Sequence, residues 1–433
     1  MNWIAGRWES GRLLGWGVGP AKIRLLVSLC ATIMTIAGPP VSAQAASGLF
    51  ELIEEVPTPA PLGGQEPSLT THDNALYMSW MELAGQQSRV MMAIRTSTGW
   101  TDPRLVQQGD DLFVNWADFP GVAVFDDGTI AVHWLREVGG SNFDYQIEIA
   151  LSGDDGVTWS KPLIPHDDRS SAQHGFVSML PDGRDALSVI WLDGRAYGTG
   201  GDGPLDLPGA MQLRATTLMR DGTMGPDEAV DLQTCSCCQT SLASTGTGTI
   251  LAVYRDRAEG EIRDISVVRL TDQGWEEPAT VHEDGWELSG CPVNGPAIAA
   301  DGDDVAVAWF TGANDVGAVK VAFSDNAARS FGTPVRIDLG NPIGRVDLEL
   351  LDDGTALVSW VEWVDGNEVL YLCQTDGGTG CIARQLLATN SAGASINFPR
   401  MARLGREIFV AWTQPTAAGD SLALRRLVLA GAD

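Results

Sequence analysis

One pattern of apolar and polar positions recurs seven times along the chain. Each copy contains a short apolar segment, a turn that often reads Asp-Gly, and a second strand whose side chains alternate before an aromatic residue. Period-2 alternation rich in Val, Ile and Trp predicts β-strands, and Asp-Gly turns join antiparallel neighbours. The aromatic residues recur every 51 to 63 positions, at Trp80, Trp134, Trp191, Tyr254, Trp309, Trp360 and Trp412.

A third strand follows each aromatic residue, and a fourth follows in six copies after a turn rich in Gly or Asp. Four strands per copy at this period indicate an all-β protein, a β-propeller of about seven four-stranded blades, with six as the alternative. The seventh copy lacks its fourth strand. Residues 49–56 (LFELIEEV) are available to supply it from the other end of the chain, which would remove two exposed sheet edges. This closure favours seven blades in a single domain over residues 44–433.

The first 43 residues have the pattern of an export signal. Basic residues lead into an apolar run at 25–37, and Val41-Ser42-Ala43 forms a cleavage site of the small-x-small type. An apolar run of about 13 residues is too short to span a bilayer. We therefore predict that residues 1–43 are a signal peptide and that the mature protein is secreted or periplasmic, with no membrane association beyond export.

The net charge of the chain indicates which classes of binding partner to expect. The chain of 433 residues carries a formal net charge of −28, and its first 43 residues contain more basic than acidic side chains. Such acidity keeps a protein soluble and argues against nucleic acid and anionic membranes as partners. We expect a soluble monomer.

One turn carries a family resemblance. Residues 152–159, Ser-Gly-Asp-Asp-Gly-Val-Thr-Trp, resemble the Asp-box (BNR) motif S-x-D-x-G-x-T-W, and a degenerate copy lies at residues 324–331. The motif is typical of the turn between the third and fourth strands in sialidase-like propellers. The resemblance implies a propeller of the sialidase-like family, an acidic glycan or a small carboxylate as substrate, and exo-sialidase-type glycoside hydrolysis as the activity to test.

Propeller topology places most of the unusual residues on one face, around the mouth of the central channel. Sialidase chemistry requires arginines for the sugar carboxylate, an acid/base group, and a Tyr nucleophile activated by a Glu. The catalytic candidates by position are Asp118, His174, Tyr254 and Glu362. The substrate-binding candidates are Asp193, Arg195, Arg255, Arg257, Arg263, Asn294 and Arg345, of which Arg195, Arg257 and Arg345 are the candidate carboxylate clamp.

Purely structural roles remain open for these residues. Asp-Arg pairs often bridge adjacent propeller blades, and Tyr254 is placed to pack like the Trp that it replaces. The insertion at 195–208 lies on the same face and is a candidate lid or specificity loop. Without a clear nucleophile, a non-enzymatic binding scaffold is the alternative to an enzyme.

Cysteine usage supplies a separate prediction. Cys373 ends a third strand and Cys381 begins the next fourth strand, so the two can form a disulfide across one hairpin. The remaining cysteines of residues 44–433 lie where the fourth and fifth copies begin, at Cys235, Cys237, Cys238 and Cys291. Disulfides, including one between Cys238 and Cys291, are the favoured interpretation. A copper or zinc site with these four thiolates as ligands is the alternative.

Overall fold

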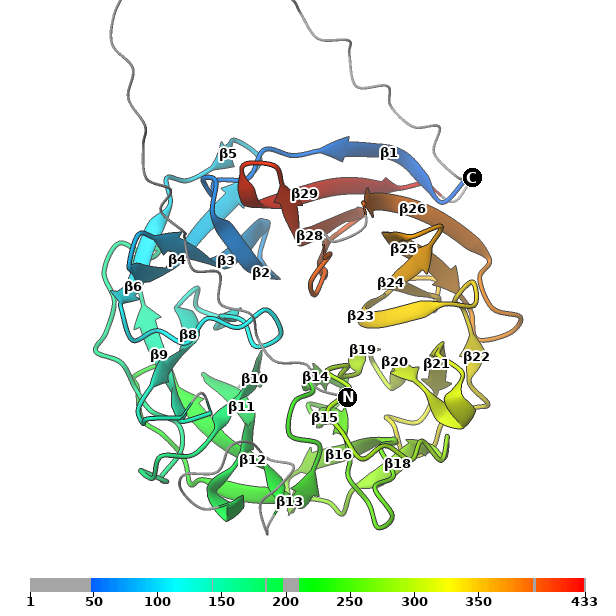
Figure 1. Ribbon diagram of the computed structural model, residues 1–433, viewed down its shortest axis with the longest axis horizontal. Coiled ribbons are helices and arrows are strands. Elements are labelled where there is room, and N and C mark those ends of the chain that lie inside the picture. The colour runs from blue at the N-terminus through cyan, green and yellow to red at the C-terminus, as the bar shows by residue number, and fades with distance from the viewer. Residues whose placement is uncertain (1–47, 142, 184, 198–209, 392–394, 432–433) are drawn as a thin grey trace, which may run out of the picture. The chain divides into compact units, whose positions relative to one another are not determined.

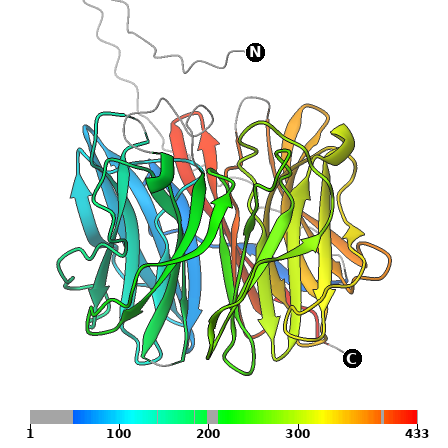
Figure 2. The ribbon, with the colours of Figure 1, turned by 90° about the horizontal axis from the view of Figure 1, so that it is seen from below.

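The computed structural model describes residues 48–141, 143–183, 185–197, 210–391 and 395–431. These residues form seven antiparallel sheets around a central channel, a seven-bladed β-propeller (Figure 1). Figure 2 shows the blades from the side, with their strands running between the two faces. The predicted fold class and the count of seven blades are confirmed. The predicted signal peptide at 1–43 and most of the insertion at 195–208 lie outside the described residues. No helix among the described residues is long and apolar enough to cross a membrane.

The first four blades follow the chain from the inner to the outer strand. Blade one contains β2 (Gly64–His72), β3 (Ala75–Ala84), β4 (Gln87–Thr96) and β6 (Arg104–Gly109), with a short β5 (Gly99–Trp100). Blade two contains β7 (Val122–Val124), β8 (Ile130–Glu137) and β9 (Tyr145–Ser152). Blade three contains β10 (His174–Pro181), β11 (Ala186–Asp193), β12 (Met211–Met219) and β13 (Glu228–Thr234). Blade four contains β14 (Ser241–Ser244), β15 (Ile250–Arg255), β16 (Ile265–Thr271), β17 (Gly274–Trp275) and β18 (Ala279–His282).

The last three blades continue in the same order. Blade five contains β19 (Ala297–Asp301), β20 (Asp304–Thr311), β21 (Ala318–Ser324) and β22 (Val335–Arg336). Blade six contains β23 (Pro342–Leu350), β24 (Ala356–Val364), β25 (Asn367–Thr375) and β26 (Ala383–Asn390). Blade seven contains β27 (Arg400–Leu404), β28 (Glu407–Thr416), β29 (Gly419–Leu429) and β1 (Phe50–Glu55).

Two details refine the prediction for individual blades. The fourth strand expected in blade two is reduced to a single antiparallel bridge between Ile149 and Leu163. The missing strand of blade seven is supplied by β1, which runs antiparallel to β29 with Ile53 opposite Leu427. Residues from both ends of the domain therefore share one sheet, as the sequence predicts.

The seven aromatic residues of the repeat are all buried, and most of them also make a polar contact. The indole Nε1 groups of Trp80, Trp191 and Trp360 donate to a carboxylate two residues further along the same strand. Trp134 and Trp309 donate to a carboxylate from elsewhere in the chain, and the Tyr254 hydroxyl donates to Asp231. A buried donor left without an acceptor is costly, so these carboxylates stabilise the blades.

The two turns that resemble Asp boxes share one hydrogen-bond pattern. In the first, the Asp154 carboxylate accepts from the Thr158 backbone N–H at 2.8 Å, and the Ser152 hydroxyl accepts from the Gly156 N–H at 2.9 Å. In the second, Asn326 accepts from the Ser330 N–H at 3.0 Å. Each turn connects the third strand of its blade to the next segment and carries no reactive chemistry.

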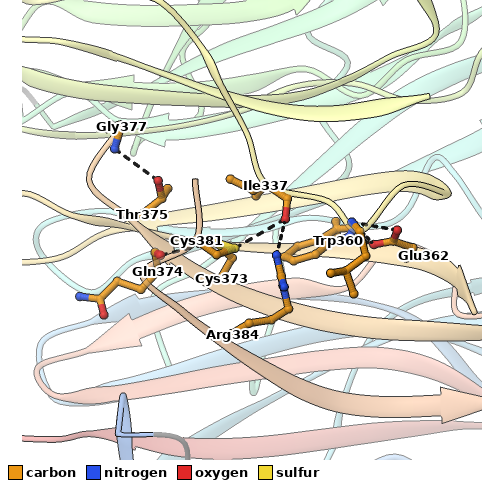
Figure 3. Close-up of a disulfide and its surroundings, with 10 residues drawn as sticks. Ile337, Trp360, Glu362, Cys373, Gln374, Thr375, Gly377, Cys381 and Arg384 are labelled. Carbon is orange, nitrogen blue, oxygen red and sulfur yellow. Dashed lines mark hydrogen bonds between the residues drawn. A yellow bond between two sulfur atoms is a disulfide. The ribbon is translucent and has the colours of Figure 1, made fainter. Parts of the chain in front are cut away.

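The predicted disulfide between Cys373 and Cys381 is confirmed (Figure 3). It joins β25 to the segment before β26, and the two Cα atoms lie 5.5 Å apart. The bond cross-links the outer hairpin of blade six.

Candidate functional site at the channel mouth

The segment between β6 and β7 reaches toward the propeller axis (Figure 1) and contains Trp116. The Asn115 side-chain oxygen accepts from the Ala117 backbone N–H at 2.8 Å, which fixes the turn around Trp116. The Trp116 side chain is 42% exposed. The Arg345 guanidinium carbon lies 5.2 Å from the centre of its ring, and the Phe398 ring stacks at 5.7 Å. An exposed aromatic ring beside a cation suits recognition of a sugar that carries a carboxylate.

Arg345 is held rigidly from several sides. Its Nη1 donates to the Ser395 hydroxyl at 2.8 Å, to the Ile396 carbonyl and to the Glu368 carboxylate at 3.3 Å. Its backbone N–H donates to the Asn294 side-chain oxygen at 2.7 Å. Burial lowers the pKa of Arg345, because desolvation disfavours the charged guanidinium. The structure thus brings together two of the predicted substrate-binding residues, Arg345 and Asn294.

A buried carboxyl completes this part of the mouth. The Asn397 amide donates to Glu66 Oε1 at 2.8 Å, and the Glu66 backbone N–H donates to the Thr413 hydroxyl. Burial raises the pKa of Glu66 to about 8, although Asn397 and the nearby Arg345 charge both act to lower it. The Glu66 carboxyl is therefore largely protonated at neutral pH. Sequence reasoning missed Glu66 and Asn397, because they lie in β2 and in the loop before β27, and no motif in the sequence links the two segments.

Asp118 lies deeper, beside a channel cavity of about 150 Å³. The Phe176 backbone N–H lies 2.9 Å from both of its carboxylate oxygens. A Cβ atom at Gly175 would overlap the carboxyl, so the adjacent chain packs closely against it. Burial raises the pKa of Asp118 to about 7, and the Phe176 hydrogen bond opposes this shift. Burial thus favours the protonated form of this carboxyl, as a general acid requires.

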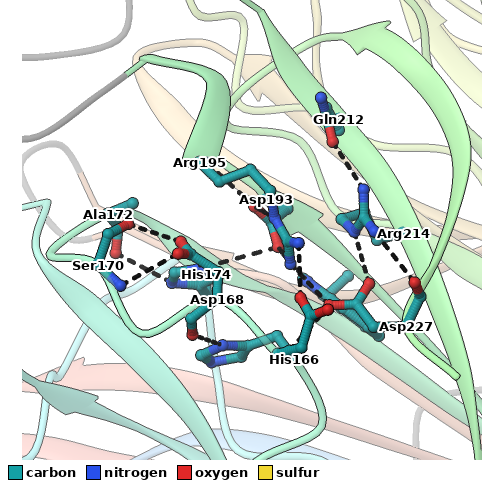
Figure 4. Close-up of polar contacts among 12 residues, drawn as sticks. His166, Asp168, Ser170, Ala172, His174, Asp193, Arg195, Gln212, Arg214 and Asp227 are labelled. Carbon is teal, nitrogen blue, oxygen red and sulfur yellow. Dashed lines mark hydrogen bonds and ion pairs between the residues drawn. The ribbon is translucent and has the colours of Figure 1, made fainter. Parts of the chain in front are cut away.

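His174 belongs to a buried ion-pair network in blade three (Figure 4). Its Nε2 lies 3.1 Å from Asp168 and 3.6 Å from Asp193, and its ring stacks on His166 with centroids 3.9 Å apart. The His174 side chain is fully buried. Burial lowers the pKa of His166 to about 4, assisted by the neighbouring His174 charge. Neither ring has the access to solvent that an acid/base catalyst needs.

The Arg195 guanidinium binds carboxylates of the same network instead of facing a free binding pocket. Its guanidinium contacts Asp193 at 2.8 Å, Asp227 at 2.7 Å and Asp167 at 2.7 Å (Figure 4). Asp193 also accepts the Trp191 indole N–H. The ligand atoms of Asp168, His174 and Asp193 lie within 4.8 Å of one another, a spacing compatible with a metal ion. The Arg195 guanidinium already donates to both oxygens of Asp193, so a metal ion fits this group poorly.

The other predicted arginines lie in separate networks. Arg257 and Arg263 both pair with Glu261, at 2.8 Å and 2.5 Å. Arg255 is buried, and its guanidinium donates to the backbone carbonyls of Asn294, Arg263 and Phe310. The predicted clamp of Arg195, Arg257 and Arg345 is thus distributed over three blades and three sets of partners.

Tyr254 and Glu362 do not form a nucleophile pair. The Tyr254 side chain is fully buried, and its hydroxyl donates to Asp231 at 2.5 Å. Burial and the Asp231 charge raise the pKa of Tyr254. Glu362 accepts from the Trp360 indole and from the Leu339 and Asn341 backbone N–H groups. Both residues therefore hold blades together, as the alternative interpretation of Tyr254 expects.

Among the described residues, Cys235, Cys237, Cys238 and Cys291 are free thiols. The predicted Cys238–Cys291 disulfide is wrong for this structure, because Cys238 faces Cys235 at 3.3 Å whereas Cys291 faces the Ser236 hydroxyl at 3.4 Å. Hydrogen bonds from Cys237 and Cys238 hold the pKa of Cys235 below its ordinary value. Burial raises the pKa values of Cys237 and Cys238.

Comparison with known proteins supports the fold at this point. No family model and no curated protein matches the sequence, so the Asp-box resemblance has no support from a family match. Among solved structures, an ulvan lyase of polysaccharide lyase family PL25 matches with a TM-score of 0.60 at 12% identity, over 87% of this chain and 96% of that one. The polysaccharide lyase Uly1 matches with a TM-score of 0.52 at 10% identity, over 88% and 99%. A Trypanosoma rangeli sialidase matches at 0.48 and 12% identity, over 79% and 60%. Polysaccharide lyase and sialidase propellers are thus among the structural neighbours of this chain.

Proposed function

We propose that this protein binds acidic glycans at the channel mouth and recognises a sugar carboxylate through Arg345 beside Trp116. The observation that carries the proposal is the exposed Trp116 ring with the Arg345 guanidinium 5.2 Å from its centre. Arg345 is held by Ser395 and Glu368, so little ordering is needed when a ligand binds. The ulvan lyase was solved with a GlcA(1-4)Rha3S repeat bound, which favours a uronate-containing glycan as the first ligand to test.

Titration calorimetry with three oligosaccharides tests this proposal. We expect the GlcA–Rha3S oligosaccharide or a sialoside to bind, and a neutral oligosaccharide of equal length to bind at least about tenfold more weakly. Arg345→Gln and Trp116→Ala should each weaken acidic-glycan binding by about tenfold or more, because each removes one half of the recognition pair.

Matched controls lie elsewhere on the same molecule. Trp363→Ala removes another tryptophan that is 42% exposed, and Arg336→Gln removes an arginine on the outer strand β22. Both variants should bind like the unaltered protein. The proposal fails if neither acidic glycan binds, or if the neutral oligosaccharide binds equally well.

A second candidate function is glycoside hydrolysis of the exo-sialidase type. It is favoured by Asp118, whose carboxyl lines the channel cavity and has a pKa raised to about 7 by burial. A carboxyl that is partly protonated near neutral pH is suited to act as a general acid. Release of a fluorogenic leaving group from a sialoside, lost in Asp118→Asn, would support hydrolysis. Binding without turnover would leave the protein as a non-enzymatic glycan-binding scaffold.

A further inference from the structure

Four cysteine sulfurs lie at the start of blades four and five. None of these cysteines belongs to the proposed glycan site at Trp116 and Arg345. Cys235 follows β13, Cys237 and Cys238 precede β14, and Cys291 precedes β19. The Cys235 Sγ lies 3.3 Å from the Cys238 Sγ and 3.9 Å from the Cys237 Sγ. All three sulfurs lie within 4.8 Å of one another. The Cys291 thiol interacts with Cys237 and with the Ser236 hydroxyl.

These separations match the requirements of a metal–thiolate centre. Metal–sulfur bonds of about 2.3 Å in a tetrahedral zinc site place neighbouring sulfurs about 3.8 Å apart. The observed distances of 3.3 Å and 3.9 Å bracket that value, so small side-chain rotations suffice to coordinate an ion. Purely sulfur donors select soft metal ions over calcium or magnesium, which prefer oxygen.

We propose that Cys235, Cys237 and Cys238 bind one soft metal ion, Cu(I) or Zn(II), with Cys291 as the fourth ligand. Cys235 and Cys238 are buried, whereas Cys291 is exposed. The site is therefore shielded on one side and open on the side of Cys291. This arrangement supplies an access route for the ion and protects the bound form from solvent.

The electrostatic surroundings also favour an anionic centre. Arg255 is 1% exposed and donates to three backbone carbonyls; among the described residues no carboxylate forms an ion pair with it. Its charge acts on Cys238, and the charge of Arg263 acts on Cys235 and Cys291. A buried cation without a carboxylate partner is costly. A metal ion with three or four thiolates carries net negative charge and would provide the missing counter-charge.

The backbone holds the cluster in place before any ion binds. The Cys235 N–H donates to the Arg255 carbonyl at 3.0 Å, and the Gln173 amide donates to the Ser236 carbonyl at 2.9 Å. These contacts tie the Cys-Ser-Cys-Cys segment to blades three and four. A site that is positioned in the folded protein binds metal without paying for a large rearrangement.

Anaerobic metal titration of the purified, reduced and metal-stripped protein tests the proposal. Zn(II) and Cu(I) are added in separate arms, and bound metal is counted by elemental analysis. We expect one ion per chain in at least one arm, and a thiolate-to-metal charge-transfer band when Co(II) replaces Zn(II). Binding in one arm alone identifies the metal. A bound stoichiometry near zero in both arms overturns the proposal.

Substitutions assign the ligands. Cys237→Ser should weaken metal binding by at least about a hundredfold, because it removes a ligand outright. Thr247→Ala, at an exposed turn between β14 and β15, retains all four thiols and should bind like the unaltered protein. Metal binding that persists unchanged in Cys237→Ser contradicts the assignment.

Thiol protection keeps the test decisive if Cys237→Ser fails to fold. In the unaltered protein, bound metal should shield Cys235, Cys237 and Cys238 from alkylation, as read by mass spectrometry of each peptide. Alkylation of all three at the same rate with and without metal overturns the proposal. So does protein in which the four cysteines form disulfides and which still binds no metal after reduction.

Discussion

At the scale of single residues, the partners that the fold supplies, rather than residue type, decide which groups are available for chemistry. Arg195 and Arg345 are both arginines at the channel-mouth face, yet Arg195 contacts three carboxylates, whereas Arg345 contacts one, Glu368, and lies against the exposed Trp116 ring. His174 has two acceptors for its Nε2 and is fully buried. The sequence identifies such residues by position, but their partners come from segments far away in the chain.

Asp118 leads to a prediction about pH. Its pKa is about 7 in the folded protein, and a carboxyl of this type has a pKa near 3.9 when unfolded. Between about pH 4 and pH 7 the unfolded chain releases this proton while the folded protein keeps it, so the contribution of Asp118 to stability falls as pH rises. We expect Asp118→Asn to remove a pH-dependent loss on the order of 4 kcal/mol across this window.

Urea unfolding at several pH values measures this effect. The free energy of unfolding of the unaltered protein, relative to Asp118→Asn, should decline as pH rises from 4 to about 7. Asp126→Asn, at an exposed turn position, serves as the control and should leave the profile unchanged. Parallel pH profiles for Asp118→Asn and the unaltered protein would show that the folded carboxyl is ionised throughout.

At the scale of the blade, the repeated aromatic residue and its carboxylate act as one unit. Trp360 donates to Glu362 at 2.8 Å, and Glu362 also accepts from two backbone N–H groups of the preceding segment. Trp412 occupies the equivalent position in blade seven, but its buried indole N–H has no hydrogen-bond partner among the described residues. The indole N–H at this position of the repeat thus has an acceptor in blade six and none among the described residues in blade seven.

This contrast predicts different costs for the same substitution. Trp360→Phe should lower the free energy of unfolding by about 1–3 kcal/mol more than Trp412→Phe, because only the first breaks a buried hydrogen bond to a charged group. Both changes remove the same ring atoms, so lost packing largely cancels in the comparison. Equal losses in chemical denaturation would show that Glu362 contributes little through the indole.

The blades could be predicted from the sequence because their causes are local. Alternation, Asp-Gly turns and the recurring aromatic residue lie within each copy, and the hairpin disulfide joins Cys373 to Cys381 across eight positions. The site depends on contacts between distant segments. Glu66 meets Asn397 across 331 positions, and Arg345 meets Ser395 across 50. No pattern within a repeat encodes such pairs, so Glu66 was missed and Glu362 was assigned a catalytic role that its structural contacts do not support.

At the scale of the whole molecule, closure of the ring depends on one short strand. The inner strands contact one another in order around the channel, and blade seven is completed by β1 from the start of the domain. β1 covers the edge of β29, and Phe50 is 2% exposed in the core that it shares with Leu427. The stability of the ring is therefore linked to the N-terminal segment of the domain.

Removal of β1 tests this link. A chain that begins at residue 57 should have a lower melting temperature than one that begins at residue 48, because it loses the burial of Phe50 and the β1–β29 hydrogen bonds. It should also aggregate in proportion to concentration, since β29 would present an unpaired edge to other molecules. Calorimetry and light scattering measure the two effects, and Phe50→Ala provides a milder version with an expected loss of about 3–5 kcal/mol. If the shortened chain melts at the same temperature and stays monodisperse, blade seven is stable with three strands and ring closure does not depend on β1.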